Sequence, residues 1–94
     1  MIQQPITIIN KLGLHARAAA KLVACSSRFE SNIQLKKGEP QKNEQIANGK
    51  SIMGVMMLAA SQHTELVLHI DGKDEQEALD ALVELINDKF GEAA

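Results

Sequence analysis

The sequence contains neither tyrosine nor tryptophan, and Phe29 and Phe90 are its only aromatic residues. Proteins that bind single-stranded nucleic acid stack bases on aromatic side chains, and duplex-binding proteins present a basic surface. This chain offers neither feature, because its 10 basic and 12 acidic residues are interspersed and its formal net charge is -2. The composition therefore argues against nucleic acid as a partner and disfavours an RNA-binding domain.

Cysteine and long apolar runs are equally scarce. The single Cys25 cannot form an intramolecular disulfide, so a reducing compartment is expected. Its position in a helical apolar pattern predicts a structural residue rather than a reactive thiol. No stretch reaches the roughly eighteen apolar residues that a membrane-spanning helix needs. We therefore expect one soluble, cytoplasmic domain over residues 1–94.

The apolar periodicity predicts four strands and three helices. Alternating apolar residues predict strands over 5–9, 32–36 and 65–70 and a short strand around Ile46. Spacings of three and four predict helices over 16–27, 52–58 and 75–90, with a turn at 37–40 and a polar stretch at 41–45. Asp74 with Glu77 resembles a capping box, and Gly91 is placed to end the last helix. The order β-α-β-β-α-β-α predicts a two-layer α+β sandwich with one open sheet face.

The stretch from Gly13 to Arg17 combines the features of an anion site. Gly13 permits a sharp turn, and His15 then falls at the N-cap of the first predicted helix, where imidazole is not a preferred residue. The amides of Ala16 and Arg17 lack intrahelical partners, and with the helix dipole they favour an anion. The Arg17 guanidinium can add further donors. The spacing alone leaves two interpretations open, a nucleophilic histidine beside a phosphate site or a plain helix cap.

Two motifs in this order resemble a known family. Residues 13–19, Gly-Leu-His-Ala-Arg-Ala-Ala, closely resemble the active-site motif of HPr, the histidine phosphocarrier of the bacterial phosphoenolpyruvate-dependent phosphotransferase system. Residues 49–56, Gly-Lys-Ser-Ile-Met-Gly-Val-Met, resemble the regulatory serine region of the same family. The length and the order of elements also fit. The resemblance implies an HPr-like open-faced β-sandwich, in which three helices cover one face of a four-stranded antiparallel sheet.

The resemblance also implies a role for each matching residue. His15 would carry the phosphoryl group on Nδ1, as pros-phosphohistidine, and Ala16 and Arg17 would bind the phosphate. Ser51 would be phosphorylated by an HPr kinase/phosphorylase, where the organism has one. Ser51 is in any case a suitable N-cap, and a phosphate there would meet free amides. Its charge at the edge of the docking surface would repel an acidic partner.

The chain departs from the family pattern in two places. Many members have proline where this chain has Ala18, so its first helical turn is expected to be slightly less rigid. The segment 36–48 is longer than in common members, which predicts an extended β-hairpin. That hairpin should leave the phosphate site intact and would alter contacts with a regulatory partner.

The second predicted helix contributes an apolar surface. If Val55 and Leu58 are buried, the opposite side of this helix exposes apolar residues that need an explanation. Core packing of its methionines is the alternative. Methionines repack easily against successive partners, and a basic rim steers acidic partners. The predicted docking face combines residues of two helices: Ala16, Ala20, Lys21, Ile52, Met53 and Met56, rimmed by Arg28 and Lys50.

We interpret the chain as a monomeric phosphocarrier without a cofactor, and not as a turnover enzyme. It is expected to accept a phosphoryl group from phosphorylated enzyme I and to pass it to IIA domains. A nitrogen-branch or purely regulatory paralogue would use the same His15 chemistry, whereas a small non-phosphorylated adaptor domain would use His15 only structurally. His63 and His69 lack cysteine or carboxylate partners at ligand spacing, so no metal site is expected.

Overall fold

The computed structural model describes residues 1–39 and 42–94, so Pro40 of the predicted turn and Gln41 of the predicted polar stretch lie outside the described residues. Within these ranges the chain forms β1 (Ile2–Thr7), α1 (Ala16–Ser26), β2 (Asn32–Glu39), β3 (Lys42–Asn48), α2 (Ile52–Met57), β4 (Glu65–Asp71), α3 (Glu75–Asn87) and the short 3-10 helix η1 (Lys89–Gly91). This order confirms the prediction. Each helix in this part of the chain is too short or too polar to span a bilayer.

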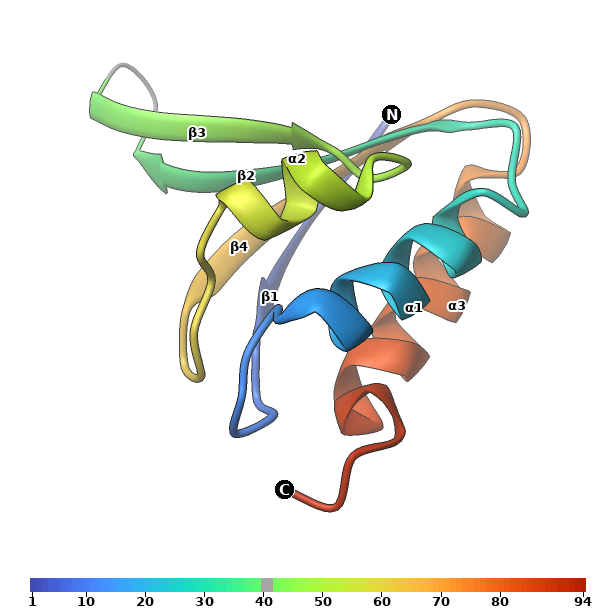
Figure 1. Ribbon diagram of the computed structural model, residues 1–94. Helices are drawn as coiled ribbons and strands as arrows, with labels where there is room; N and C mark the ends of the chain where they lie inside the picture. Colours follow the sequence, from blue (N-terminus) through green and yellow to red (C-terminus); the bar gives the residue numbers. More distant parts are fainter. Residues whose placement is uncertain (40–41) are drawn as a thin grey trace.

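The strands form one antiparallel sheet in the order β1-β4-β2-β3. The α-helices lie on a single face of the sheet, with α1 and α3 side by side and α2 next to the β2-β3 end (Figure 1). The opposite sheet face is left without helices. The predicted open-faced sandwich is therefore confirmed for the described residues.

The hydrophobic core fills the space between the sheet and the helices. Burial alternates along β4, because successive side chains of a strand point to opposite sheet faces. In β4, the buried residues Leu66, Leu68 and Ile70 point to the helices. The helices contribute buried residues at helical spacing to the same core: Ala18, Ala19, Leu22, Val55, Ala78, Leu82 and Ile86. Burial of these two apolar faces is what holds the helical layer against the sheet.

Cross-strand pairing moves the first strand relative to its predicted position. β1 spans Ile2–Thr7 instead of 5–9, because β4 pairs with this whole segment. This pairing includes the polar Gln3 and Gln4 in the strand, although no apolar alternation in the sequence predicts a strand there. Pro5 is tolerated because β1 is an edge strand of the sheet. Ile8 lies beyond the strand and is still fully buried.

The β2-β3 hairpin is longer than its local sequence suggests. The turn predicted at 37–40 is wrong for its described part, because β2 continues to Glu39. Gly38 has a φ of +92°, and the pairing register shifts between Lys37 and Glu39, so the glycine forms a bulge within the strand. β3 covers Lys42–Asn48, whereas only a short strand was expected. The pairing of β2 with β3 confirms that this segment forms a hairpin.

The start of α3 contradicts the predicted capping box of Asp74 and Glu77. Asp74 occupies the N-cap position, but its side chain makes no cap hydrogen bond. Its carboxylate instead accepts hydrogen bonds from the amides of Glu30 and Ser31, at 2.9 and 3.0 Å, and from the Ser31 hydroxyl at 2.5 Å. Asp74 therefore joins the start of α3 to the segment before β2, a long-range contact that local pattern cannot reveal.

The end of α3 also differs from the prediction. The helix ends at Asn87 rather than Phe90, because Lys89 and Phe90 adopt positive φ angles of 56° and 55°. The Phe90 side chain is nonetheless only 1% exposed, so its burial offsets the unfavourable backbone conformation. Gly91, with a φ of +78°, follows the turn and brings the last residues toward α1.

Candidate functional site

His15 is held at the N-cap of α1 by the loop that precedes it. Its φ and ψ are -71° and 177°, and its carbonyl accepts the first helical hydrogen bond from Ala19 at 2.8 Å. Gly13 supplies a φ of +67°, and the Leu14 amide donates to the Ala60 carbonyl at 2.8 Å. The loop is therefore pinned to the segment that follows α2, and the histidine is presented at the helix end.

The start of α1 presents hydrogen-bond donors beside this histidine. The first amides of a helix have no carbonyl one turn earlier, and Ala16 and Arg17 are both exposed. The first turn contains no acidic residue that would offset the positive end of the helix dipole. Among the described residues, the Arg17 guanidinium has no hydrogen-bond or ion-pair partner. The structure thus brings the three residues predicted to form an anion site to one helix end.

A carboxylate from the other end of the chain completes this site. Glu92 places Oε2 2.5 Å from Nε2 of His15, and the side chains of these residues are only 14% and 28% exposed. The side-chain amide of Asn10 donates to Oε1 of Glu92 at 3.0 Å. The His15 hydrogen bond, and next the Asn10 hydrogen bond, lower the pKa of Glu92. Sequence reasoning missed both residues, because Glu92 lies 77 residues from His15 and carries no local signal.

The site is a shallow hollow rather than a deep cavity. It opens at the start of α1, beside the last residues of the chain. Seven residues line it: Lys11, Leu12, His15, Ala16, Arg17, Glu92 and Ala94. Both basic and acidic side chains therefore border the imidazole, and a phosphoryl group on another protein could reach it directly.

Ser51 occupies the N-cap of α2, as predicted. Its hydroxyl accepts a hydrogen bond from the Gly54 amide at 3.1 Å, and its φ and ψ of -121° and 113° are those of an extended cap residue. The side chain is only partly buried. The hydroxyl therefore lies at the surface, at a helix end where amides are available to an anion.

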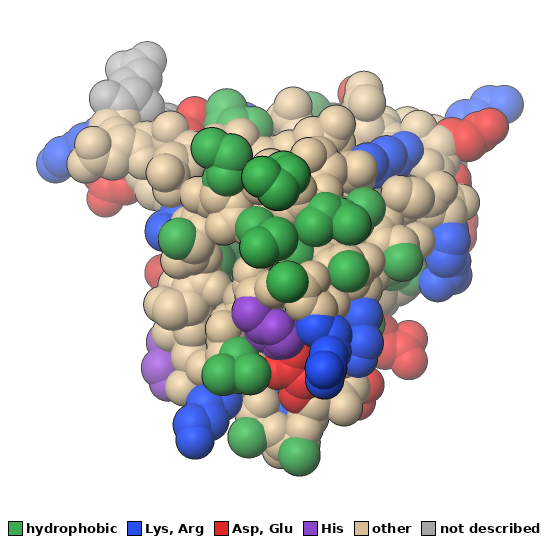
Figure 2. All heavy atoms as spheres, viewed as in Figure 1, with side chains coloured by type: hydrophobic (Ala, Val, Ile, Leu, Met, Phe, Trp, Pro, Cys, Tyr) green, Lys and Arg blue, Asp and Glu red, His purple; other side chains and the backbone are tan. Residues whose placement is uncertain are grey.

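The exposed side of α2 agrees with the predicted apolar surface. Ile52, Met53 and Met56 are 43%, 69% and 38% exposed, whereas Val55 and Leu58 are buried. These methionines are therefore not core residues. Ala16 and Ala20 are exposed on α1, which contacts α2. Figure 2 shows hydrophobic side chains gathered over these two helices, with a histidine and basic and acidic side chains directly below them.

Two further exposed apolar residues extend this surface. Met57 at the end of α2 and Leu12 in the loop before His15 are 73% and 67% exposed. Neither residue belongs to the docking face predicted from the sequence. The helical spacing of Ile52, Met53 and Met56 already marks one side of α2, and Met57 adjoins that side because it follows Met53 by four residues.

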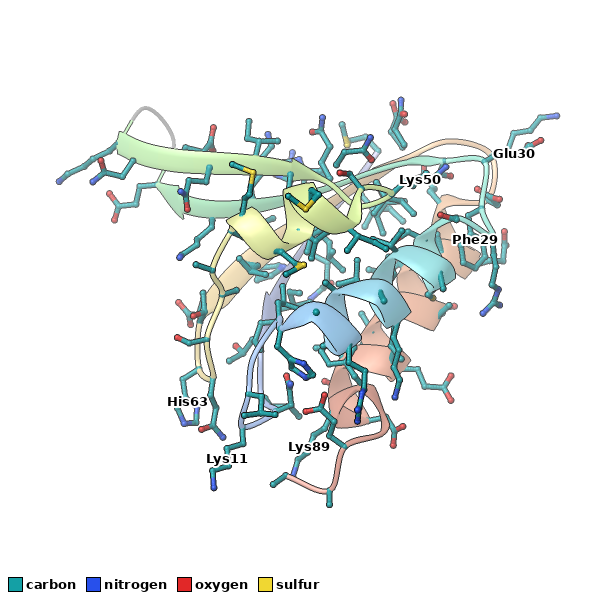
Figure 3. The ribbon with its side chains drawn as sticks, viewed as in Figure 1. Lys11, Phe29, Glu30, Lys50, His63 and Lys89 are labelled. Carbon is teal, nitrogen blue, oxygen red and sulfur yellow. The ribbon has the colours of Figure 1, made fainter. Side chains whose placement is uncertain are left out.

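Lys21 of the predicted docking face and the rim residues Arg28 and Lys50 each make a specific contact. Lys21 donates to the Phe90 carbonyl at 2.6 Å, and Lys50 donates to the Phe29 carbonyl at 2.7 Å. The Arg28 guanidinium lies 5.2 Å from the centre of the Phe29 ring. Phe29 and Lys50 lie together at one end of the molecule, away from Lys11 and Lys89 at the other end (Figure 3). The Lys21 and Lys50 amines are thus bound to backbone carbonyls, whereas Arg28 contacts a ring and remains exposed.

The remaining histidines and the cysteine lie apart from one another. His63 is exposed in a turn, and His69 lies on the sheet face opposite Leu68 and Ile70. Cys25 is 8% exposed in the core, and burial raises the pKa of its thiol. In the part of the chain that the structure describes, no cluster of three or more histidine, cysteine or acidic residues could hold a metal ion.

Comparisons with known proteins place this geometry in a family. The sequence model of the family described as "PTS HPr component phosphorylation site" matches residues 2–88. The phosphocarrier protein HPr of Pseudomonas aeruginosa is 55% identical over 87 residues, covering 93% of this chain and 92% of its own. HPr of Neisseria meningitidis is 52% identical over 92 residues, 98% of each chain. The crystal structure of HPr-C-His from Thermoanaerobacter tengcongensis superposes with a TM-score of 0.87 at 46% identity and covers both chains completely. The chain therefore belongs to the HPr family of phosphocarrier proteins.

Proposed function

We propose that the protein accepts a phosphoryl group on Nδ1 of His15 from phosphorylated enzyme I and passes it to IIA domains of the phosphotransferase system. The observation that carries this proposal is the position of His15 at the N-cap of α1, beside the amides of Ala16 and Arg17. The imidazole makes no cap hydrogen bond, which supports a role other than capping the helix. Membership of the HPr family supports a phosphocarrier role.

Each residue has a distinct part in the transfer. The Nδ1 lone pair attacks the phosphorus atom, and the bond between phosphorus and the donor nitrogen breaks with its electron pair returning to the donor. The amides of Ala16 and Arg17 and the Arg17 guanidinium bind the phosphoryl oxygens as charge moves toward His15. The reverse sequence delivers the group to the acceptor.

The stabilisation has to remain modest in a carrier. A helix N-terminus stabilises an anion by about 0.3–1 kcal/mol at an exposed site. Because His15 and Arg17 lie in a shallow, solvent-open hollow, water screens these interactions further. The group is thus held without being trapped.

Ser51 is proposed as a second, regulatory phosphorylation site for an HPr kinase/phosphorylase. Its partly exposed hydroxyl lies at the N-terminus of α2, next to the exposed Ile52 and Met53. A phosphate there would add about two negative charges at the edge of the proposed docking face. Binding of an acidic partner would then be slower and weaker.

The proposed docking face consists of Ala16, Ala20 and Lys21 on α1 with Ile52, Met53 and Met56 on α2. Enzyme I and IIA domains would bind this face in turn, because methionine side chains repack against differently shaped partners. We further propose that residues 1–94 act as one monomeric domain in the cytoplasm, where both partners would meet it.

The test is transfer from phosphoenolpyruvate through a purified enzyme I. Intact-mass analysis should show one added phosphate, lost in acid and kept in base. His15→Ala should accept none and retain a thermal midpoint close to that of the unchanged protein. His63→Ala is the matched control, because His63 is exposed in a turn, and it should be phosphorylated normally.

Two results would contradict the proposal. Absence of phosphate on the unchanged protein, with an enzyme I that phosphorylates another carrier, would favour an adaptor domain. Phosphate that persists on His15→Ala would place the acceptor elsewhere in the chain.

A further inference from the structure

Glu92 links the imidazole of His15 to a buried amide. Its Oε2 lies 2.5 Å from Nε2 of His15, while its Oε1 accepts from Nδ2 of Asn10 at 3.0 Å. The same Nδ2 donates to the Gly13 carbonyl at 2.8 Å. Three segments that are distant in sequence therefore meet in one hydrogen-bonded chain, which ends on the imidazole.

The orientation of Asn10 is unambiguous. Both of its partners, a backbone carbonyl and a carboxylate, are acceptors only, so the amide nitrogen must face them. Asn10 is fully buried, so it cannot turn to solvent. One oxygen of Glu92 is thereby committed to Asn10, and the other is left to face His15.

The C-terminal segment that carries Glu92 is anchored independently. The Phe90 ring is 1% exposed in the core, and Lys21 donates to the Phe90 carbonyl at 2.6 Å. The positively charged groups near the carboxylate are Lys21, whose charge also lowers its pKa, and Lys11 and Arg17 along the hollow. All of these charges favour the ionised carboxylate, which accepts hydrogen bonds and donates none.

We propose that Glu92 is a positioning residue for the transfer: oriented by Asn10, its carboxylate keeps the proton of the His15 ring on Nε2 and the lone pair on Nδ1. This inference rests on the proposed phosphocarrier function. When Nδ1 forms its bond to phosphorus, the ring becomes a cation with Nε2 still protonated, and Glu92 balances that charge. When the bond breaks, its electron pair returns to Nδ1 and neutral imidazole is restored. No proton has to move in either direction.

Substitution of Glu92 by glutamine provides a sharp test, because Asn10 dictates how the new amide must lie. The glutamine oxygen would accept from Asn10, and its NH₂ group would then donate to Nε2 of His15. That arrangement favours the opposite tautomer, with the proton on Nδ1. Glu92→Gln should therefore be worse than Glu92→Ala, which removes the acceptor without supplying a donor.

The first measurement is the His15 tautomer in the unphosphorylated protein, from two-bond proton–nitrogen correlations of the labelled ring. The unchanged protein should be protonated at Nε2, and Glu92→Gln should shift population toward protonated Nδ1. Glu84→Gln is the matched control, since it removes the same charge from an exposed position on α3 and should leave the ring unchanged. His63 and His69 serve as internal references in the same spectra.

The second measurement is the initial rate of phosphoryl acceptance from enzyme I. Glu92→Gln should lower it by about tenfold or more, because the wrong tautomer offers no lone pair at Nδ1, and Glu92→Ala should fall between the two. Unchanged tautomer populations in Glu92→Gln, or equal rates for the glutamine and alanine variants, would overturn the inference. Failure of the unchanged protein to accept phosphate would overturn only the proposed function, since the tautomer measurement does not depend on transfer.

Discussion

The Leu14 amide donates a hydrogen bond of 2.8 Å to the Ala60 carbonyl, and this bond positions the loop that carries the histidine. The contact brings Gly13 so close to Ala60 that a β-carbon on Gly13 would lie 2.4 Å from the same carbonyl oxygen. The site residue and the segment after α2 therefore share one tightly packed junction. A change at Gly13 has to disturb both.

Gly13→Ala is expected to destabilise the protein. Its φ of +67° costs an L-residue about 1–2 kcal/mol, and the clash with Ala60 adds to that. Gly91→Ala is the matched control, because it has a similar φ of +78° and only the flexible Lys21 amine nearby, at 3.3 Å. Urea unfolding of both variants should show the larger loss for Gly13→Ala. Equal losses of unfolding free energy would mean that the backbone at Ala60 can shift to accommodate the new β-carbon without destabilising the protein.

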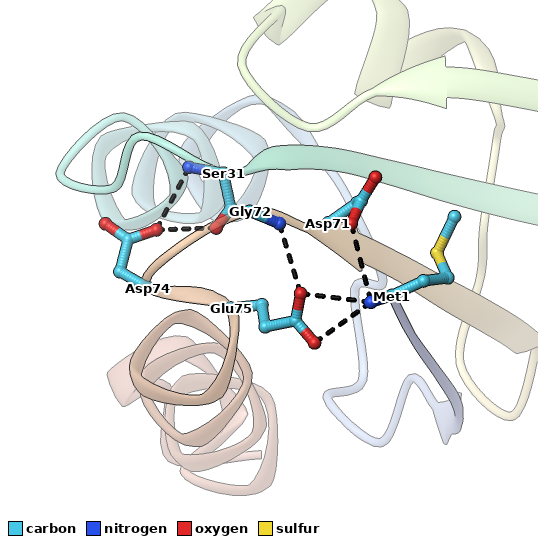
Figure 4. Close-up of polar contacts among 6 residues, drawn as sticks. All are labelled: Met1, Ser31, Asp71, Gly72, Asp74 and Glu75. Atoms are coloured by element: carbon cyan, nitrogen blue, oxygen red, sulfur yellow. Dashed lines mark hydrogen bonds and ion pairs between the residues drawn. The ribbon is translucent and has the colours of Figure 1, made fainter.

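Asp74→Asn should lower stability in a pH-dependent way. The Asp74 carboxylate accepts from Ser31 and Glu30, as Figure 4 shows for Ser31 beside the neighbouring contacts of Met1 and Glu75. These hydrogen bonds, first that of the Ser31 hydroxyl, lower the pKa of Asp74 below its ordinary 3.8. A carboxyl with a lowered pKa stabilises the fold above its unfolded pKa, and this contribution is lost as pH falls through the lowered value.

Thermal unfolding from pH 7 to pH 2 is the appropriate measurement for Asp74→Asn. The unchanged protein should unfold at a higher temperature than the variant near neutral pH, and the gap should close at the acid end. A gap that stays constant down to pH 2 would show that the charge of Asp74 is not what matters.

Two substitutions at Ser51 should separate its capping role from its proposed regulatory role. Ser51→Ala loses the hydrogen bond from Gly54 and should cost about 1 kcal/mol of unfolding free energy, while accepting phosphate at the normal rate. Ser51→Asp keeps a capping oxygen, so it should remain near the original stability but accept phosphate more slowly. The rate of phosphoryl acceptance from enzyme I and the urea unfolding of both variants check these two predictions. Normal kinetics in Ser51→Asp would count against the docking-edge argument.

Met53→Glu should weaken the encounter with enzyme I. Met53 is 69% exposed on α2, so a charge there should leave the fold intact and should oppose an apolar, acidic partner surface. Transfer at limiting enzyme I should slow by about tenfold, a typical cost for a central interface residue. Ile46→Glu is the control, because Ile46 is 54% exposed on the sheet face away from the helices. Similar rates for both variants would place the docking face elsewhere.

Much of the fold follows from periodicity that can be read locally. The alternation of Leu66, Leu68 and Ile70 predicts β4, and the helical spacing around Leu22 predicts α1, because each pattern has one solution that buries its apolar side. The local pattern does not predict strand residues whose conformation depends on pairing with a neighbouring strand. The residues of β1 before Pro5 and of β3 before Ile46 are strands only because a neighbouring strand pairs with them.

The candidate site divides along the same line. His15, Ala16 and Arg17 were named from sequence because they fall together at the start of α1, and Ser51 was named because it falls at the start of α2. That start, with its free amides, is a local property of the chain. The exposed side of α2 is local as well, since Val55 and Leu58 show which side is buried.

Only the tertiary structure decided what surrounds the imidazole. Asn10 and Glu92 lie 82 residues apart, and they meet because packing of Phe90 in the core turns the end of the chain toward α1. The Asp74 side chain likewise makes no cap hydrogen bond in its own helix and accepts one from the Ser31 amide, 43 residues away. The sequence by itself determined that His15 lies at a helix start, because that position depends on local backbone geometry, and the phosphoryl role that we propose for it came from the resemblance of residues 13–19 to the HPr motif. The long-range hydrogen bonds that orient His15 depend on how the layers pack, and no local pattern encodes them.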